Sequence, residues 1–309
     1  MATPLLIDTD MGVDDAVAVS LALASEVFDV RGIVGVGGNV ELDQVMKNTG
    51  GLLSAIKPPV MPPIGRGLES PGSTHGDRRG LFGRDGFGEC DMPAGKAPEA
   101  ADYIELYRRA IEGAGGKLIV LATGPLSNVA AVLGEASSSS ADIKHIYLTG
   151  GAVWTRGDVN ETAEFNFHRD PQAAARVLAS GLPITVLPLD VSRLVCLDES
   201  HVARLAASGY RTGEVLAKLL QCPLESDEEP GYGKCCIPDA VTVGSIIWSD
   251  LFLKTRMRLD ITTKGTEAGR CRPALGGDKS LHANLLTAVN AADFLENLLE
   301  ALCREAFVV

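Results

Sequence analysis

Basic residues are scarce in this chain relative to acidic ones. The 28 Lys and Arg stand against 40 Asp and Glu, which gives a net charge of −12 and a pI of about 4.9. A surface that grips a phosphate backbone needs a surplus of basic side chains, so we expect no nucleic-acid partner. No apolar run approaches the roughly 20 residues of a membrane helix, and we expect no membrane partner either.

The amino terminus and the cysteines also lack the usual marks of a secreted protein. No basic stretch followed by a long apolar one precedes the first aspartates, so we expect no signal peptide. The seven cysteines are odd in number and have no CxxC spacing, although Cys235 and Cys236 are adjacent. We therefore expect reduced thiols in a cytoplasmic protein.

Short apolar runs alternate with amphipathic segments along the whole chain, with no internal repeat and no convincing linker. This order predicts an α/β protein with an open, doubly wound, mostly parallel sheet of the Rossmann-like kind, in a single domain 1–309. Strands are expected at 4–7, 30–36, 117–122, 143–148 and 183–188. Helices are expected at 14–24, 42–56, 126–133, 171–180, 199–207 and 291–304.

Two irregular segments interrupt this pattern, at 65–98 and 223–237. The first is rich in Gly, Pro, Arg and Asp, and the second begins with an acidic stretch that leads to Tyr232 between two glycines. Long irregular segments in a compact domain are often lids or binding loops. Plain surface insertions explain them equally well, and both readings stay open.

Four aspartates follow the first expected strand within eight residues: Asp8, Asp10, Asp14 and Asp15. The carboxyl ends of strands are where open α/β sheets bind their ligands. Capping of the next helix explains one or two of these residues but hardly four. Because close carboxylates repel one another, the cluster predicts a hard divalent cation such as Ca²⁺ or Mg²⁺.

This aspartate segment resembles the DxDxGxDDA signature of the inosine–uridine nucleoside hydrolase family. Further segments resemble the family's later motifs in the same order, namely GGN at 37–39, TGPLSN at 123–128, TGG at 149–151, AEFN at 163–166, DP at 170–171 and PDA at 238–240. The resemblance covers residues 5 to about 245. It implies a nucleoside hydrolase fold and a Ca²⁺-dependent hydrolysis of ribonucleosides to base and ribose, in a homodimer or homotetramer.

Carried over position by position, the resemblance implies a role for each motif residue. The Ca²⁺ ion would be held by Asp10, Asp15, the Thr123 carbonyl and Asp239, with water and two ribose hydroxyls in its shell. Asp10 would also be the general base. The ribose would be bound by Asp14, Asn39, Asp158, Glu164 and Asn166. Carboxylates suit this reaction because its transition state resembles a ribosyl cation.

Several of these residues have simpler explanations. Asn39 could be a left-handed turn residue. Glu164 and Asn166 alternate with phenylalanines and could belong to a strand with a polar outer face. Asp170 before a proline is expected to cap a helix, Asp239 could do the same, and Asp8 is expected to support the site from behind.

Besides Met11, which stands where proline is common, the chain has three departures from the family pattern near the expected substrate. Thr149 replaces a methionine, and Asp158 stands where an asparagine that binds the 5′ side of ribose is common, so that Asn160 could take over. Pro238 stands where many relatives have a histidine proposed to protonate the departing base. Candidate residues for the base side are therefore His75 and Tyr232, with the thiols of 235 and 236 as further options.

Two other functions compete with this interpretation. The Asp8-Thr9-Asp10 sequence after a strand mimics the nucleophile motif of haloacid-dehalogenase-like phosphatases, but Gly12 stands where that family has Thr or Val. A calcium-dependent sugar-binding protein of the same fold, with little turnover, is the non-enzymatic alternative. Retention of Asp10 argues against it, and the three departures argue for it.

Overall fold

The computed structural model describes residues 2–71, 79–90, 92, 99–135, 142–226, 233–274, 276 and 281–304. Its centre is a sheet in which ten strands can be followed within these residues, in the order β11-β10-β12-β7-β6-β5-β1-β2-β3-β4. Neighbouring strands from β12 to β4 all run parallel, whereas β10 is antiparallel to both β12 and β11. The predicted mostly parallel α/β sheet in one domain is confirmed.

The strands of this sheet are β1 Thr3–Thr9, β2 Phe28–Gly35, β3 Ile64–Arg66, β4 Ala101–Asp102, β5 Leu118–Ala122, β6 Ile143–Thr149, β7 Ile184–Leu187, β10 Phe252–Ile261, β11 Cys271–Ala274 and β12 His282–Val289. A separate antiparallel pair is formed by β8 Cys196–Asp198 and β9 Lys234–Cys236. The helices are α1 Val13–Ala24, α2 Leu42–Ile56, α3 Arg79–Phe82, α4 Tyr103–Ala114, α5 Ser127–Gly134, α6 Phe165–Arg169, α7 Pro171–Leu178, α8 Leu189–Ser192, α9 Glu199–Ala206, α10 Arg211–Leu219, α11 Gln221–Glu225, α12 Pro238–Ile247, the 3-10 turn Ser249–Leu251 and α13 Ala291–Leu302.

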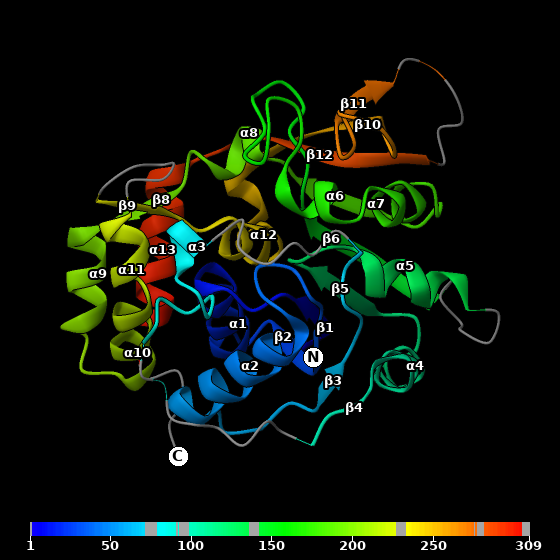
Figure 1. Ribbon diagram of the computed structural model, residues 1–309. Helices are drawn as coiled ribbons and strands as arrows, with labels where there is room; N and C mark the ends of the chain where they lie inside the picture. The colour runs from blue at the N-terminus through cyan, green and yellow to red at the C-terminus, as the bar shows by residue number, and fades with distance from the viewer. Residues whose placement is uncertain are drawn as a thin grey trace.

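The sheet is covered on both faces, and β1 contributes to both cores. Leu5 and Ile7 pack into the apolar cluster that contains α1, α2, α12 and α13, whereas Leu6 between them packs into the cluster with α4, α5 and α7. All three side chains are fully buried. Figure 1 shows the two helical layers on either side of the central strands. Because successive strand residues point to opposite faces, a strand buried on both sides is apolar throughout.

The chain reverses its winding direction at β1. From this strand the order runs through β2, β3 and β4 on one side and through β5, β6 and β7 on the other. The loops that follow β1 and β5 therefore diverge and leave a crevice at the carboxyl edge of the sheet, the usual ligand position in such folds.

The predicted elements agree with the structure to within two residues at most ends, and the 42–56 helix agrees at both ends. The description of 65–98 and 223–237 as irregular was partly wrong. The first range contains the end of β3 and the short α3, and the second contains the end of α11 and all of β9. These pieces are too short to carry a periodic pattern. Among the described residues, none of the helices is long and apolar enough to cross a membrane.

Candidate active site

The turn from β1 into α1 is conformationally strained. Met11 is fully buried and has a φ of 39°, in the left-handed region that most side chains avoid. Its N–H donates to the Thr9 hydroxyl (3.1 Å), and its carbonyl accepts from the Asn48 amide (3.2 Å). Such a conformation costs about 1–3 kcal/mol and is typical of functional sites, where surrounding contacts enforce it.

Asp15 is held rigidly below this turn. One carboxylate oxygen accepts from the hydroxyls of Thr9 (2.5 Å) and Thr123 (2.7 Å), and the other accepts from the Gly12 N–H (2.8 Å) at the start of α1. The carboxylate thus joins the ends of β1 and β5. The prediction that Asp14 and Asp15 lie in the first helical turn is confirmed.

Asp10 lies at the tip of β1 against the loop that follows β2. Its Oδ2 accepts from the Asn39 N–H at 2.8 Å. A Cβ on Gly38 would lie 2.1 Å from the same oxygen, so only glycine allows the backbone to approach so closely. Asn39 is absent from the positive-φ residues, and the left-handed-turn explanation for it was wrong.

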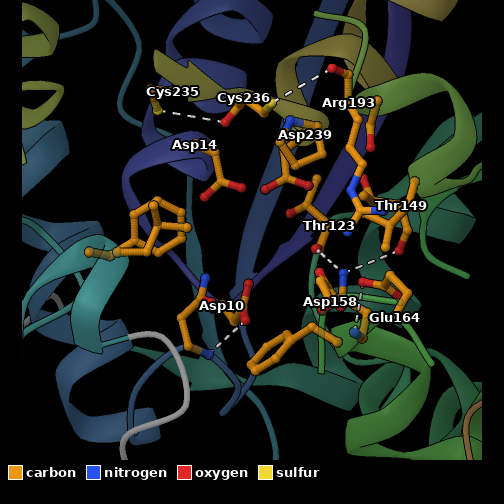
Figure 2. Close-up of a pocket in the computed structure, with 18 residues that line it drawn as sticks. Asp10, Asp14, Thr123, Thr149, Asp158, Glu164, Arg193, Cys235, Cys236 and Asp239 are labelled. Carbon is orange, nitrogen blue, oxygen red and sulfur yellow. Dashed lines mark hydrogen bonds between the residues drawn. The ribbon is translucent and has the colours of Figure 1, made fainter. Parts of the chain in front are cut away.

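Asp239 reaches the same place from the other end of the chain. It occupies the first turn of α12, directly after Pro238, and α12 packs against α1. Figure 2 shows the carboxylates of Asp14 and Asp239 directed toward each other. Oxygen atoms of Asp14, Asp15 and Asp239 all lie within 4.8 Å of one another, and all three residues are buried. Asp10 is not a member of this closest group, although its charge acts on Asp239.

The electrostatics of this cluster call for a positive charge. Burial raises the pKa of Asp10 and of Asp239 well above the usual value, and the charges of the neighbouring aspartates raise both further. Burial also raises the pKa of Asp15, against the hydrogen bonds that it accepts. Within the described residues, the buried Oδ1 of Asp239 accepts no hydrogen bond. Clustered carboxylate oxygens with spare acceptor capacity fit a hard divalent cation.

The residues of α6 form the opposite side of the pocket. Glu164 caps this helix, because its carboxylate accepts from the N–H groups of Asn166 (2.8 Å) and Phe167 (3.1 Å), as well as from Gly151 (2.8 Å). Burial and the charge of Asp158 raise the pKa of Glu164 to about 7. The strand explanation for this segment was wrong, since three N–H groups converging on one carboxylate begin a helix instead.

Asn166 connects the ends of two central strands. Its side-chain amide donates to the carbonyls of Thr123 (2.8 Å) and Thr149 (3.2 Å), which follow β5 and end β6. The Thr149 hydroxyl lies 2.8 Å from the Thr242 hydroxyl on α12 and also lowers the pKa of Asp239. The threonine that replaces the family methionine thus supports the aspartate cluster.

Asp8 supports the site from the other face of the sheet, as predicted. It accepts from the Tyr107 hydroxyl (2.8 Å) and the Asn128 amide (3.1 Å), and burial raises its pKa to about 7. Asp170 caps α7 by accepting from the Ala173 N–H (2.9 Å), also as predicted.

Asn160 does not line the pocket. Its side-chain Oδ1 accepts from the N–H groups of Thr162 and Ala163 in a local turn, so the expectation that it replaces Asp158 was wrong. Asp158 itself does line the pocket.

One pocket gathers most of the predicted residues. Its polar floor comprises Asp10, Asp14, Asn39, Thr123, Glu164, Asn166 and Asp239. Asp15 lies beneath this floor, fully buried. The apolar wall comprises Leu81, Phe82, Cys235, Cys236 and Pro238, and Thr149, Asp158, Phe165, Leu189, Ser192 and Arg193 complete the lining. Sequence reasoning missed α3 and α8, which carry no motif, and gave no role to Phe165, although this residue belongs to the AEFN motif. His75 and Tyr232 lie outside the described residues.

The expectation of seven reduced cysteines was wrong. Cys196 and Cys236 form a disulfide between β8 and β9, and the other five cysteines are free. This pair could not be predicted from cysteine spacing, because its members lie 40 residues apart and meet only through strand pairing.

Comparison with known proteins agrees with this architecture. The family model of the inosine-uridine preferring nucleoside hydrolases matches residues 5–296. The pyrimidine-specific ribonucleoside hydrolase RihA of Salmonella arizonae is 31% identical over 274 residues, with 86% of each chain covered. Among solved structures, a purine-preferring ribonucleoside hydrolase from Gardnerella vaginalis superposes with a TM-score of 0.90 at 25% identity, and an inosine-guanosine nucleoside hydrolase superposes with 0.85 at 26%. Both comparisons cover 99% of each chain.

The fold and the pocket are thus those of a hydrolase acting on N-glycosyl compounds. The chain belongs to the inosine-uridine preferring nucleoside hydrolase family. This membership rules out the phosphatase alternative and favours an enzyme over a sugar-binding protein.

Proposed function

We propose that this enzyme hydrolyses the N-glycosidic bond of ribonucleosides with the help of a calcium ion, and that Asp10 is its general base. The main support is the meeting of three buried aspartates within 4.8 Å at the first turns of α1 and α12, beside Asp10. A floor so rich in carboxylates suits a reaction whose transition state carries positive charge on the sugar.

The ligands that we assign to the ion are Asp10, Asp15, the Thr123 carbonyl and Asp239. All are oxygen donors at the ends of β1, β5 and α12, and Ca²⁺ takes six to eight such ligands from protein, water and substrate. When bound, a divalent cation lowers the pKa of a water molecule in its shell. The Thr123 carbonyl already accepts from Asn166, and a second lone pair leaves it free to face a cation.

Asp10 is suited to accept the proton of the attacking water. One of its oxygens is fixed by the Asn39 N–H, which orients the carboxylate toward the pocket. Burial among other acidic groups raises its pKa, so the carboxylate is a stronger base than an exposed one. The attack that it assists is directed at the anomeric carbon of the ribose.

We assign ribose binding to the other polar residues that line the pocket. Figure 2 shows Asp14 on one side of the pocket and Asp158 and Glu164 on another, and Asn39 and Asn166 also line it. Their carboxylate and amide groups can hold the sugar hydroxyls and fix the sugar for attack. The nucleobase is then left facing the apolar wall.

We propose that purine nucleosides and activated ribosides are better substrates than uridine. Pro238 cannot donate a proton, and a purine base can be protonated from solvent as it leaves. The relatives differ on this point, since some are named pyrimidine-specific and others purine-preferring. His75 and Tyr232 stay candidates for the base side.

A ribose-release assay on a panel of nucleosides, each with and without a chelator, tests the whole proposal. We expect release from inosine that stops on chelation and returns with Ca²⁺ but returns less with Mg²⁺. Full activity in excess chelator would overturn the calcium assignment, and no release from any nucleoside would overturn the reaction. The homodimer or homotetramer, the cytoplasmic location and a role in nucleoside salvage stay predictions; size-exclusion chromatography with light scattering tests the first.

A further inference from the structure

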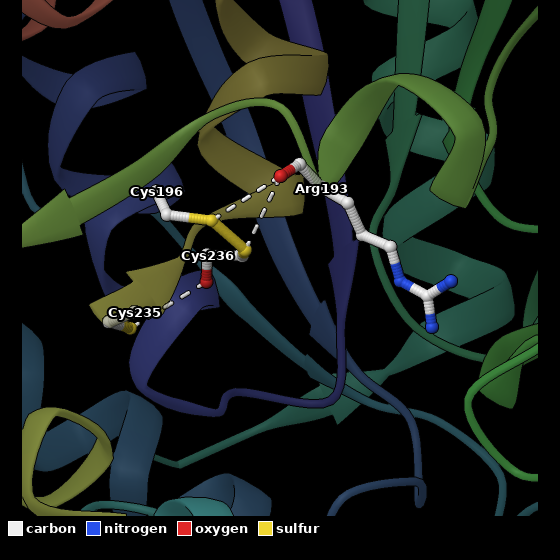
Figure 3. Close-up of a disulfide and its surroundings, with 4 residues drawn as sticks. All are labelled: Arg193, Cys196, Cys235 and Cys236. Atoms are coloured by element: carbon white, nitrogen blue, oxygen red, sulfur yellow. Dashed lines mark hydrogen bonds between the residues drawn. A yellow bond between two sulfur atoms is a disulfide. The ribbon is translucent and has the colours of Figure 1, made fainter. Parts of the chain in front are cut away.

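The Cys196–Cys236 disulfide lies at the edge of the pocket. The two residues face each other directly in the antiparallel pair of β8 and β9, with their Cα atoms 3.8 Å apart. Figure 3 shows the bond beside the backbone of Arg193, whose side chain extends away from it. Both sulfur atoms contact the Arg193 carbonyl oxygen, at 3.5 and 3.9 Å. Cys236 also lines the pocket, whereas Cys196 does not.

The bond stands next to the metal ligand in the chain. Only Ile237 and Pro238 separate Cys236 from Asp239, and α12 begins at this proline. The Ile237 N–H donates to the Val195 carbonyl at 3.4 Å, and both of these side chains are fully buried. The position of β9 against β8 therefore sets where α12 starts and where its first carboxylate lies.

The strand β9 contacts α11, and its Cys235 side chain is buried in the apolar core, but its backbone pairing is limited. Within the described residues this three-residue strand pairs with β8 and with no other strand. Two-stranded ladders this short are marginal by themselves. A covalent bond across the ladder removes the freedom of β9 to separate from β8.

The neighbouring thiol does not compete for this bond. Cys235 pairs with Leu197 in the ladder, whereas Cys236 pairs with Cys196, and Cys235 is 1% exposed. Burial raises the pKa of its thiol, which keeps it protonated and unreactive. Cys196 and Cys236 are partly exposed, so a small thiol reagent can reach their sulfur atoms.

We propose that the Cys196–Cys236 disulfide is a positioning pair for the hydrolase, which fixes β9 and thereby Asp239 and the apolar wall, so that the site is fully assembled only when the pair is oxidised. This inference rests on the proposed function for its catalytic consequence. Its structural core, the coupling of the bond to the cation site, can be measured without turnover.

The redox step is a two-electron exchange with a dithiol. The dithiol transfers two electrons and two protons to the sulfur–sulfur bond. The bond breaks, Cys196 and Cys236 become thiols, and the reagent becomes a cyclic disulfide. The freed thiols gain hydrogens that can donate to the Arg193 carbonyl that the sulfur atoms already contact. No covalent bond then joins β8 to β9, so β9 and the start of α12 can shift, although α12 still packs against α1.

The test compares the oxidised and reduced forms of the full-length protein. Wild type is treated with oxidised glutathione or with dithiothreitol, and free thiols are alkylated and mapped by mass spectrometry. Calorimetry on metal-stripped protein then gives the dissociation constant for Ca²⁺, and inosine hydrolysis gives kcat and KM. We expect a cross-linked 196–236 peptide in the oxidised form. Reduction should weaken Ca²⁺ binding about 10- to 100-fold, as loss of support around metal ligands typically does.

Two variants separate this bond from general effects of reductant. Cys196→Ser removes the bond without changing a residue that lines the pocket. Its Ca²⁺ affinity and KM should equal those of reduced wild type and should not change with dithiothreitol. Cys303→Ser is the matched control, because this thiol also contacts a backbone carbonyl, that of Arg204, but lies at the end of α13. It should respond to dithiothreitol as wild type does. Circular dichroism verifies folding, and the reduction of wild type needs no substitution at all.

The possible outcomes distinguish the positioning role of the disulfide from the proposed hydrolase reaction. Seven alkylated thiols after oxidation, or equal Ca²⁺ affinity and equal KM in the two forms, would overturn the positioning role while leaving the hydrolase proposal standing. A redox-dependent Ca²⁺ affinity in a protein that releases no ribose would instead overturn the proposed reaction and keep the coupling.

Discussion

The polar floor and the apolar wall of the pocket are built in different ways. The floor comes mainly from the ends of central strands and the first turns of helices packed on them, and its side chains are locked by short hydrogen bonds, such as those of Asp15 and Glu164. The wall comes from the four-residue α3, from β9 and from Pro238. In the proposed assignment, the groups that bind the ribose would thus be tied to the sheet, whereas those that face the base would lie on peripheral elements.

The sharpest test of the floor is the loss of its proposed base. Asp10→Asn keeps the size of the side chain but removes the proton acceptor, so we expect kcat to fall by about 10²- to 10⁴-fold. Asp10→Ala should also weaken Ca²⁺ binding. Asp102→Asn is the control, since this exposed aspartate only caps α4. A near wild-type kcat for Asp10→Asn would show that the base lies elsewhere.

The floor should also make stability depend on pH when the cation is removed. The carboxyl groups of Asp10, Asp15 and Asp239 hold their protons to higher pH in the folded chain, mainly because they are buried. Asp8 and Glu164 do so up to about pH 7. The folded state therefore binds more protons than the unfolded one between about pH 4 and 7, and its free energy of unfolding falls as the pH rises through this window.

Thermal unfolding of chelated protein at pH 5 and pH 7.5 measures this dependence. We expect the lower Tm at pH 7.5, where the ionised aspartates repel one another. Ca²⁺ at 100 times its dissociation constant should restore about 2.7 kcal/mol. The variant Asp239→Asn should reduce the pH dependence. A Tm that rises with pH in the absence of cation would contradict the charge arrangement described above.

The wall can be altered without touching the floor. Pro238→His adds a proton donor at the first position of α12, where the new N–H needs no partner within the helix. We expect kcat/KM for uridine to rise about tenfold, less than the roughly 10²- to 10⁴-fold that an optimally placed acid contributes. An activated riboside that needs no proton should gain little.

Pro171→His provides the matched control, because this proline also begins a helix but does not line the pocket. Equal gains for uridine and the activated riboside would show that position 238 does not act on the leaving group. Efficient uridine cleavage by the wild-type enzyme would mean that another residue already supplies the proton.

The smallest predicted effect on stability and Ca²⁺ affinity concerns Thr149, which also lines the pocket. Thr149→Val removes the hydroxyl that contacts Thr242 and lowers the pKa of Asp239. Its loss should cost about 1 kcal/mol of stability, as for a typical hydrogen bond. Thr185→Val removes a similarly buried hydroxyl that bonds His145. Both variants should lose similar stability, but only Thr149→Val should change Ca²⁺ affinity. Unchanged affinity would separate Thr149 from the cation site.

The same division explains what the sequence could predict. The floor follows an aspartate-rich motif on a strand that is apolar throughout, and its residues meet as expected. The segment at α6 misled because its alternating phenylalanines imitate a strand, while the decisive contacts come from Gly151 and two N–H groups at the helix start. The helix α12 was missed because apolar residues lie on all of its sides, so its sequence shows no helical periodicity of apolar and polar residues.

Only part of the wall could be predicted: Pro238 and the two adjacent cysteines were expected on the base side, whereas α3 belongs to no motif. Leu81 and Phe82 belong to a helix of four residues, and Cys236 reaches the pocket through a pairing with a strand 40 residues earlier. Such contacts depend on the register of two short strands, which composition and periodicity do not specify.

The packing of α12 against α1 has a consequence for how the protein matures. Asp14 and Asp15 are synthesised more than two hundred residues before Asp239. A contact of such long range forms late in folding, because the entropy cost of closing a large loop comes before the stabilising contact is made. At the proposed cation site, tight binding therefore requires that α12 has packed against α1. A truncated or partly folded chain should bind the ion weakly and should not hydrolyse nucleosides.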